Sequence, residues 1–274
     1  ARYNPQYRGK ISQQDKGYMM KKQIYEKVIK AKQRLENVII PSPLSYAPML
    51  SLLAQADIYL KKENLQLTGA FKIRGAFNKI ASLVEQSTHS QIQGVIAASA
   101  GNHAQGVAYA AKHFGIKAVI VMPEATPLLK VSATKALGAE VVLSGDNYDE
   151  AYAKALQVAK ERDLVFIHPF ADEEVIAGQG SIALEMIQEC EDLNVVVVPI
   201  GGGGLISGIG SVYKQLYPNV RVIGVVASGA DAMKRSFESG AIQKIESVRS
   251  IADGIAVRDV NEENLRLCKN VLMK

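Results

Sequence analysis

The sequence predicts an α/β protein of two lobes, each built on a mostly parallel sheet flanked by helices. From Gly94 onward, short apolar runs alternate with longer amphipathic segments, which is the order of strands and crossover helices in parallel sheets. Proline and glycine stand where helices would begin and end, as at Pro127 and Gly138. The 274 residues, of which 48% are hydrophobic, exceed one compact α/β unit and supply apolar surface for two cores.

Each expected element follows from this alternation. A first helical pattern begins near Lys21, and a second one places Ile73, Phe77, Ile80 and Val84 on one face. Strands are expected at 94–98, 117–121, 140–143, 164–167, 195–199 and 221–226. Helices are expected at 103–114, 127–137, 148–162 and 180–191, and from about residues 205 and 230 onward.

The composition argues against several classes of function. There are 32 Lys and Arg residues against 27 Asp and Glu, giving a net charge of +5, and the charges are interspersed, so no nucleic-acid-binding arm is indicated. Tryptophan is absent and aromatic residues make up 6%, which leaves little for a base-stacking surface. The two cysteines, Cys190 and Cys268, and the four histidines lack metal-ligand spacing. We therefore expect no metal site and a reducing, cytoplasmic environment.

Two segments, 194–213 and 1–19, differ in composition from the rest of the chain. Residues 194–213 carry no charge over a length that could cross a bilayer, but Pro199 and the following glycines would break such a helix. A buried strand entering a tight loop is the better prediction, and no membrane partner is expected. Residues 1–19 are polar and aperiodic without the pattern of a signal peptide, so we expect them to be partly leader or added sequence outside the fold.

Gly201 to Gly204 follow a predicted strand and precede a predicted helix. Four successive glycines let backbone N–H groups face one concavity, where the helix dipole also favours an anion. A P-loop is excluded because no Lys-Ser/Thr pair follows, and a dinucleotide fingerprint because Ser207 takes the place of its last glycine. A small phosphorylated group is the favoured ligand. The alternative is a glycine-rich turn that serves close packing only.

Lys72 is expected in the first turn of a helix capped by Thr68 or Gly69. In that position, the helix dipole and the neighbouring Arg74 both disfavour the ammonium form. They would lower the lysine pKa and make the free amine available, as Schiff-base chemistry requires. The alternative is a surface lysine whose stem covers apolar side chains.

The segment SAGNHAQG, from Ser99 to Gly106, directly follows another predicted strand. The free amides of small residues at a helix N-terminus suit a carboxylate, and the Asn102 side chain can hydrogen-bond a ligand oxygen. The alternative is that Ser99 or Asn102 serves only as the helix N-cap.

Taken together, these segments resemble the fold-type II pyridoxal-phosphate enzymes, and the match is close to their threonine and serine dehydratase branch. The resemblance extends in register across roughly residues 28–259. The resemblance rests on five separate stretches of sequence: TGAFKIRGAFNK (68–79), SAGNHAQGVAYAA (99–111), HPFADEEVIAGQGS (168–181), PIGGGGLISG (199–208) and IADG (251–254).

The resemblance implies a role for each matching residue toward pyridoxal 5'-phosphate and an amino-acid substrate. Lys72 would bond to the cofactor as a Schiff base and carry the proton, and Phe71 would pack near the ring. The remaining cofactor contacts would come from Asn102 at the phenolic oxygen, from Gly201, Gly202, Gly203, Gly204 and Leu205 at the phosphate, and from Gly254 beside the ring. The substrate carboxylate would be held by Ser99, Ala100, Gly101, Asn102 and His103.

Three departures from the family refine this expectation. Ala100 stands where serine racemases carry a serine as acid and base, so elimination is expected rather than racemisation. Val226 stands where those enzymes carry an acidic metal ligand, which again predicts no metal. The family normally continues beyond the position of Lys274, with a serine or cysteine at the pyridine nitrogen and with further strands. We therefore expect the C-terminal part of the larger lobe to be missing.

The resemblance implies a larger cofactor-binding lobe made of 1–93 and 165–274 and a smaller mobile lobe made of 94–164. It also implies dehydration and deamination of L-threonine to 2-oxobutanoate and ammonia, with L-serine as a secondary substrate. The alternatives are an L-serine dehydratase and a truncated, catalytically silent fragment that binds the cofactor. The resemblance further favours a homodimer or homotetramer.

Overall fold

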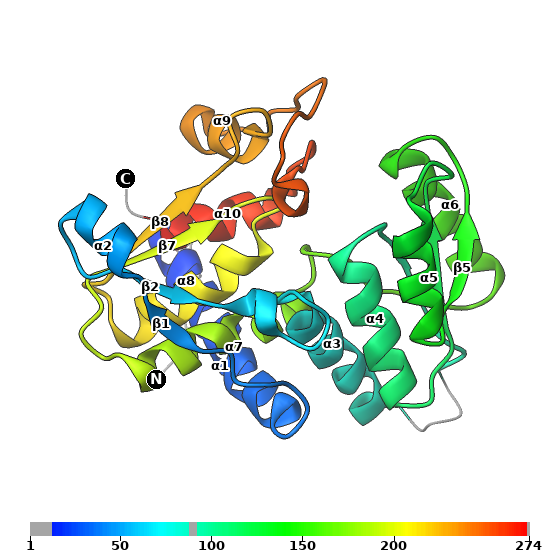
Figure 1. The fold of residues 1–274 in the computed structure, drawn as a ribbon, viewed down its shortest axis with the longest axis horizontal. Helices are drawn as coiled ribbons and strands as arrows, with labels where there is room; N and C mark the ends of the chain where they lie inside the picture. Colours follow the sequence, from blue (N-terminus) through cyan, green and yellow to red (C-terminus); the bar gives the residue numbers. More distant parts are fainter. Residues whose placement is uncertain (1–12, 88–91, 273–274) are drawn as a thin grey trace, which may run out of the picture.

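The computed structural model describes residues 13–87 and 92–272, and it has the α/β architecture that the sequence predicts (Figure 1). One group of elements surrounds a four-stranded sheet with the order β5-β4-β3-β6, in which every pairing is parallel. Its strands are β3 (Val95–Ala98), β4 (Ala118–Met122), β5 (Glu140–Leu143) and β6 (Val165–Phe166). The helices between them are α4 (Asn102–His113), α5 (Leu128–Ala136) and α6 (Tyr148–Glu161).

This sheet is covered on both faces because successive side chains of a strand point in opposite directions. Val95 and Ala97 of β3 belong to the core cluster that contains the apolar face of α4. Ile96 and Ala98 belong to a separate cluster with Ala151 and other residues of α6. All four side chains of β3 are buried, which explains why the strand appears in the sequence as a continuous apolar run.

The second group of elements surrounds two further parallel strands, β7 (Val195–Pro199) and β8 (Arg221–Val225). Its helices are α1 (Gln13–Leu35), α7 (Glu173–Glu189), α8 (Gly204–Leu216), α9 (Ala232–Ser239) and α10 (Glu262–Val271). One core cluster joins α1, α7, α8 and α10 to these strands. Short elements complete the group: the antiparallel pair β1 (Leu44–Tyr46) and β2 (Tyr59–Lys61), helix α2 (Pro48–Ala54), and the single turns η1 (Glu63–Leu65) and η3 (Asp253–Ile255).

Helix α7 sets the spacing of the two helices that flank the site, α8 and α3 (Lys72–Gln86). A Cβ at Gly178 would lie 2.5 Å from the Arg74 carbonyl oxygen of α3. A Cβ at Gly208 of α8 would lie 2.3 Å from the Ile176 carbonyl oxygen and 2.7 Å from the Gly180 nitrogen of α7. Both contacts are backbone against backbone, so only glycine permits this separation.

The predicted elements from Gly94 onward are present with small shifts of their ends. Gly115 and Gly138 adopt positive φ values of 64° and 90° just after α4 and α5, as left-handed helix ends require. The predicted start of a helix at residue 180 is wrong, because α7 begins at Glu173, where the Asp172 side chain accepts hydrogen bonds from two backbone N–H groups and caps the helix.

The N-terminal expectation also needs correction. Helix α1 begins at Gln13, so 13–19 belong to the fold, whereas 1–12 lie outside the described residues. The sequence patterns missed β1, β2 and α2, which are short and half exposed, and also α10. Residues 194–213 form β7, the glycine loop and most of α8, as predicted, but the expectation of a buried strand is wrong for β7, because Val195 and Val197 are exposed. None of the helices in the described residues combines the length and apolar character needed to cross a bilayer.

Candidate active site

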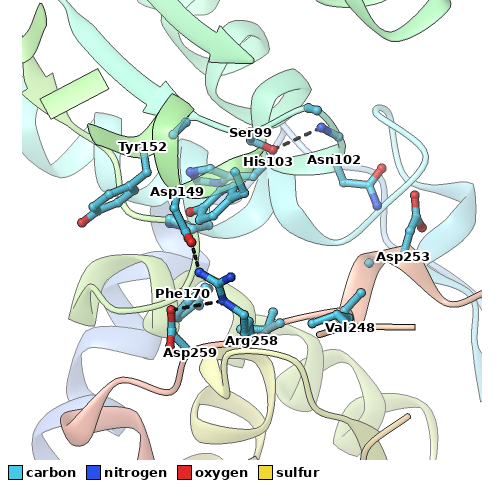
Figure 2. Close-up of a pocket in the computed structure, with 18 of the residues that line it drawn as sticks. Ser99, Asn102, His103, Asp149, Tyr152, Phe170, Val248, Asp253, Arg258 and Asp259 are labelled. Atoms are coloured by element: carbon cyan, nitrogen blue, oxygen red, sulfur yellow. Dashed lines mark hydrogen bonds and ion pairs between the residues drawn. The ribbon is translucent and has the colours of Figure 1, made fainter. Parts of the chain in front are cut away.

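A cavity of about 820 Å³ lies between the two groups of elements (Figure 2). One wall comes from the loop after β3, the N-terminus of α4 and the N-terminal half of α6. The opposite wall comes from 168–170 and from the segment 246–261 around η3. Lys72 lies on this cavity together with Ser99, Ala100, Gly101, Asn102, His103 and Gly254. The structure thus brings together predicted residues from three separate stretches of the chain.

Lys72 is the first residue of α3, and its Nζ donates a hydrogen bond of 2.8 Å to the Pro169 carbonyl oxygen. Burial lowers the pKa of this amine to about 8, because the ammonium form loses its hydration. Nζ also lies 5.4 Å from the centre of the Phe71 ring. The interpretation of Lys72 as an ordinary surface lysine is therefore wrong.

Two details of the Lys72 prediction need correction. The N-cap of α3 is Phe71, without a side-chain cap, rather than Thr68 or Gly69. Arg74 does not account for the lowered lysine pKa, since burial is its cause. The Arg74 guanidinium is fully buried and lies between two carboxylates, with contacts of 2.8 Å to Glu63 and 2.5 Å to Glu185. These partners neutralise its charge.

The glycine run connects β7 to α8 and forms a concave loop. Gly203 is the N-cap of α8 and has a φ of 90°, which favours glycine. Within the part of the chain that the structure describes, the backbone N–H groups of Gly201 to Gly204 donate to no protein acceptor. The loop borders a small chamber of about 30 Å³, which shares Lys72, Pro169, Phe170 and Gly254 with the large cavity.

Close packing also restricts this loop to glycine at two positions. A Cβ at Gly202 would lie 2.4 Å from the Phe170 ring, and one at Gly204 would lie 2.9 Å from the Phe170 carbonyl oxygen. The packing interpretation therefore holds for these two glycines. It leaves the free N–H groups unexplained, however, and unpaired donors at a helix N-terminus indicate an anion.

The N-terminus of α4 provides a second set of free donors. Gly101 is the N-cap, no side chain caps the helix, and Asn102 is exposed. The interpretation of Asn102 as the N-cap is therefore wrong. The Ser99 hydroxyl accepts a hydrogen bond of 3.2 Å from the Gly101 N–H. Among the described residues, the N–H groups of Ala100, Asn102 and His103 have no protein acceptor, so they are available to a carboxylate.

The two histidines of the site carry little positive charge at neutral pH. His103 is buried, its Nε2 lies 2.8 Å from the Ile167 carbonyl oxygen, and its Nδ1 has no partner. Burial and the nearby Lys72 lower its pKa to about 3. Burial likewise lowers the pKa of His168 to about 4, and its Nδ1 accepts from the backbone N–H groups of Phe170 and Ala171. Because the His103 ring is neutral and bonded to Ile167, the group that His103 offers to a carboxylate is its backbone N–H.

Two ion pairs between residues that line the cavity were not predicted from the sequence. Asp149 of α6 forms an ion pair with Arg258 (Figure 2). In addition, the Lys130 Nζ of α5 lies 3.3 Å from an Asp253 carboxylate oxygen. Both pairs join the two groups of elements across the opening. No local pattern could have identified these residues, because the partners of each pair are more than a hundred positions apart and each is an ordinary surface charge in the sequence.

The site fits a flat, phosphorylated ligand that reacts with an amine. Ideal Cβ atoms at Gly101 and Gly254 would meet no atom within 4 Å, so at both positions the backbone is open to the cavity. The glycine loop offers donors to a phosphate, and Lys72 lies where the chamber and the cavity meet. Among the described residues, no group of three or more His, Cys, Asp or Glu side chains is arranged to hold a metal ion.

Comparison with known proteins gives consistent matches. The sequence profile of the family described as pyridoxal-phosphate dependent enzyme matches residues 35–273. An L-threonine ammonia-lyase of Thermotoga maritima is 49% identical over 244 residues, which cover 89% of this chain and 60% of that protein. A biosynthetic L-threonine dehydratase of Haemophilus influenzae is 42% identical over 89% of this chain and 47% of its own length. The chain thus spans about half to three fifths of these relatives.

Solved structures agree with the sequence matches. The processed form of threonine deaminase isoform 2 from Solanum lycopersicum superimposes with a TM-score of 0.87 at 40% identity, covering 93% of this chain and 69% of its own. Maize serine racemase superimposes with a TM-score of 0.86 at 31% identity, covering 91% of this chain and 75% of its own.

Proposed function

From the premise that the chain belongs to the family of pyridoxal-phosphate-dependent enzymes, we propose that it catalyses the dehydration and deamination of L-threonine to 2-oxobutanoate and ammonia. The cofactor is pyridoxal 5'-phosphate. One observation carries the proposal: a lysine amine with a burial-lowered pKa borders both the cavity and the small chamber, and each of these spaces has its own set of unpaired backbone donors. The donors of the glycine loop on the chamber can bind a phosphate, and those at the N-terminus of α4 on the cavity can bind a carboxylate.

The cofactor contributes an electron sink for negative charge at the substrate α-carbon, and the chain's own residues do the rest. In our proposal, the N–H groups of Gly201 to Gly204 and Leu205 bind the phosphate, Phe71 packs near the ring, Gly254 lies beside it, and Asn102 hydrogen-bonds its phenolic oxygen. With a pKa of about 8, Lys72 has an appreciable neutral fraction at physiological pH. It can thus attack an aldehyde and then accept the α-proton of the substrate.

The substrate carboxylate lies, in this proposal, at the N-terminus of α4. Ser99, Ala100, Asn102 and His103 line the cavity there, and their free backbone N–H groups or hydroxyl would bind the carboxylate, while the loop at Gly101 has no Cβ to obstruct it. The helix dipole adds to the attraction of the carboxylate. The His103 ring is neutral and bonds to the Ile167 carbonyl oxygen, so it holds the loop without adding a charge of its own.

L-Threonine is the proposed substrate because relatives that are 49% and 42% identical to the chain are named for it, and because the cavity has apolar side chains for a methyl group. Tyr152, Phe170 and Val257 are among its lining residues. One methyl group contributes only about 1–3 kcal/mol of discrimination, so we propose L-serine as a secondary substrate. An L-serine dehydratase remains the second candidate, since a fungal L-serine ammonia-lyase superimposes with a TM-score of 0.79 at 26% identity.

Racemisation is the less favoured activity, although serine racemases are among the structural neighbours. Ala100 carries no group that could transfer a proton from its place on the cavity wall. Comparing kcat/KM for L-threonine and L-serine, with D-serine formation followed in the same samples, separates the three activities. Faster turnover of L-serine, or formation of D-serine, would contradict the threonine assignment.

Mass spectrometry after borohydride reduction tests the position of the reactive amine. The reduced pyridoxyl mass is expected on the peptide that contains Lys72, and a modification on any other lysine would refute the site. The same sample addresses a catalytically silent fragment. A protein-bound imine band that is lost in Lys72→Ala, together with turnover of L-threonine, argues against it, whereas the band without turnover would support it.

We further propose that the protein is a cytoplasmic homodimer or homotetramer, with residues 94–164 as a lobe that moves against the remainder. The exposed apolar surface around α2 supports self-association, since Met49, Leu52 and Leu53 are 69%, 74% and 77% exposed. Sedimentation analysis tests it: Leu53→Glu is expected to shift the protein toward the monomer. An unchanged oligomer would mean that this surface lies outside the interface.

A further inference from the structure

Gln179 of α7 has surroundings that the proposed function does not use. It lies between Gly178 and Gly180, the two glycines through which α7 contacts α3 and α8. The residue is 1% exposed, so its polar head is enclosed by protein and by the small chamber beside the glycine loop. Gln179 therefore lies on α7 between the contact with α3, which carries Lys72, and the contact with α8, which follows the glycine loop.

The Gln179 amide is left without a partner. Its Oε1 is buried and accepts no hydrogen bond, and within the described residues its Nε2 donates none. An unsatisfied buried amide is unfavourable, and native proteins rarely keep one without a ligand or an ordered water. Of the residues that line the small chamber, only Lys72 and Gln179 have polar side chains, and Lys72 already donates to Pro169.

The neighbouring helix makes room for this amide. A Cβ at Gly75 of α3 would lie 2.3 Å from the Gln179 Nε2 and 2.9 Å from its Cδ. Gly75 is one turn beyond Phe71, which also borders the small chamber. The absence of a side chain at Gly75 thus leaves room for the Gln179 head, and Gln179 borders the same small chamber as Gly201 to Gly204.

We propose that the Gln179 side-chain amide donates a hydrogen bond to the phosphate group that the glycine loop binds, and so is a further cofactor-binding residue. This inference rests on the proposed function only in placing the phosphate at Gly201 to Gly204. A half-turn of the terminal amide exchanges its oxygen and nitrogen, so the NH₂ group can face the chamber. A neutral donor suits this place, because a carboxylate there would repel the phosphate.

Inorganic phosphate, pyridoxal 5'-phosphate and pyridoxal are the three probes that test the proposal on the full chain without its cofactor. The nearly isosteric Gln179→Met removes only the amide. It is expected to weaken phosphate and pyridoxal 5'-phosphate about 10- to 100-fold, as for a hydrogen bond to a charged group, and to leave pyridoxal unchanged. Gln179→Glu is expected to weaken the two phosphorylated probes further.

Two other variants control for packing and for the loss of a glutamine. Gly75→Ala would place a Cβ 2.3 Å from the Gln179 Nε2 and 2.6 Å from the Val175 carbonyl oxygen, so it is expected to weaken the phosphorylated probes and also to lower the unfolding temperature. Gln157→Met, on the exposed side of α6, should alter none of the affinities. Thermal unfolding of each cofactor-free variant shows whether it is folded.

The results separate the inference from the proposed function. Unchanged phosphate affinity in a folded Gln179→Met, or an equal loss for pyridoxal and its phosphate, overturns the role of Gln179. With either of these results, the proposed function still stands if borohydride reduction of the wild type places the pyridoxyl group on Lys72. If the variants do not fold, a crystal structure of the wild type with phosphate decides, and an amide nitrogen farther than 3.5 Å from phosphate oxygen refutes the proposal.

Discussion

The lowered pKa of Lys72 predicts that replacing this lysine stabilises the cofactor-free protein at neutral pH. Burial shifts the pKa of the amine from 10.5 to about 8. Since one pKa unit corresponds to about 1.4 kcal/mol, the folded state carries a cost of about 3 kcal/mol when the amine is protonated. Lys72→Met removes the charge and keeps much of the side-chain volume, so it should recover most of that free energy.

The pH dependence has a definite sign. Below pH 8 the amine is protonated in both states, and the folded wild type bears the full cost. Between pH 8 and 10.5 only the unfolded chain holds the proton, so the stability of the wild type rises with pH. Above pH 10.5 the cost is gone. The advantage of Lys72→Met over the wild type should therefore be greatest near pH 7 and fall by about 3 kcal/mol by pH 11.

Urea unfolding of the cofactor-free wild type and Lys72→Met, measured from pH 7 to pH 11, gives this difference directly. Titrating groups that both proteins contain change the two unfolding free energies equally, so their effects cancel in the difference. Loss of the hydrogen bond to Pro169 displaces the whole difference curve by about 1 kcal/mol. Lys234→Met, at a side chain that is 60% exposed, controls for the change of net charge. A pH-independent difference would refute the argument from burial.

Three further variants test the packing of the site. Gly254→Val should leave the unfolding temperature of the cofactor-free protein unchanged, because its side chain would enter the open cavity. In an absorbance titration, the same change should weaken the binding of pyridoxal 5'-phosphate at least tenfold. Equal affinity would show that the ring lies elsewhere. Gly202→Ala should cost about 1–3 kcal/mol in urea unfolding, since its Cβ would overlap the Phe170 ring; no loss would mean that the ring moves freely. Arg74→Met should cost about 3–5 kcal/mol in the same assay, because Glu63 and Glu185 lose their buried cation; a neutral result would show that water reaches them.

Local patterns were sufficient for the parts of the site that lie at the ends of strands. The apolar runs before Ser99 and Gly201 identified β3 and β7, and the glycines and small residues after them identified two helix N-termini with free amides. These features depend on neighbours within a few positions, and a sequence presents such neighbours directly. The same holds for the left-handed glycines that end α4 and α5.

Other features depend on partners that lie far apart in the chain. The sequence predicts that Arg74 lowers the pKa of Lys72, two positions away, but in the structure Glu63 and Glu185 surround the Arg74 guanidinium. Asp149 and Arg258 form their ion pair only because two distant segments of the chain meet at the cavity. The caps of α3 could not be predicted either, because the chain entering that helix is held by tertiary contacts rather than by a capping side chain.

The sequence by itself thus determined the order of most strands and helices, the position of Lys72 at a helix N-terminus and the two loops of free backbone donors, because periodicity and glycine placement act locally. The tertiary structure alone decided why the lysine pKa falls, how closely α3, α7 and α8 approach through their glycines, and that Gln179 borders the small chamber beside the glycine loop. Burial, charge pairing and helix separation arise only when distant segments pack together, and no local pattern specifies them.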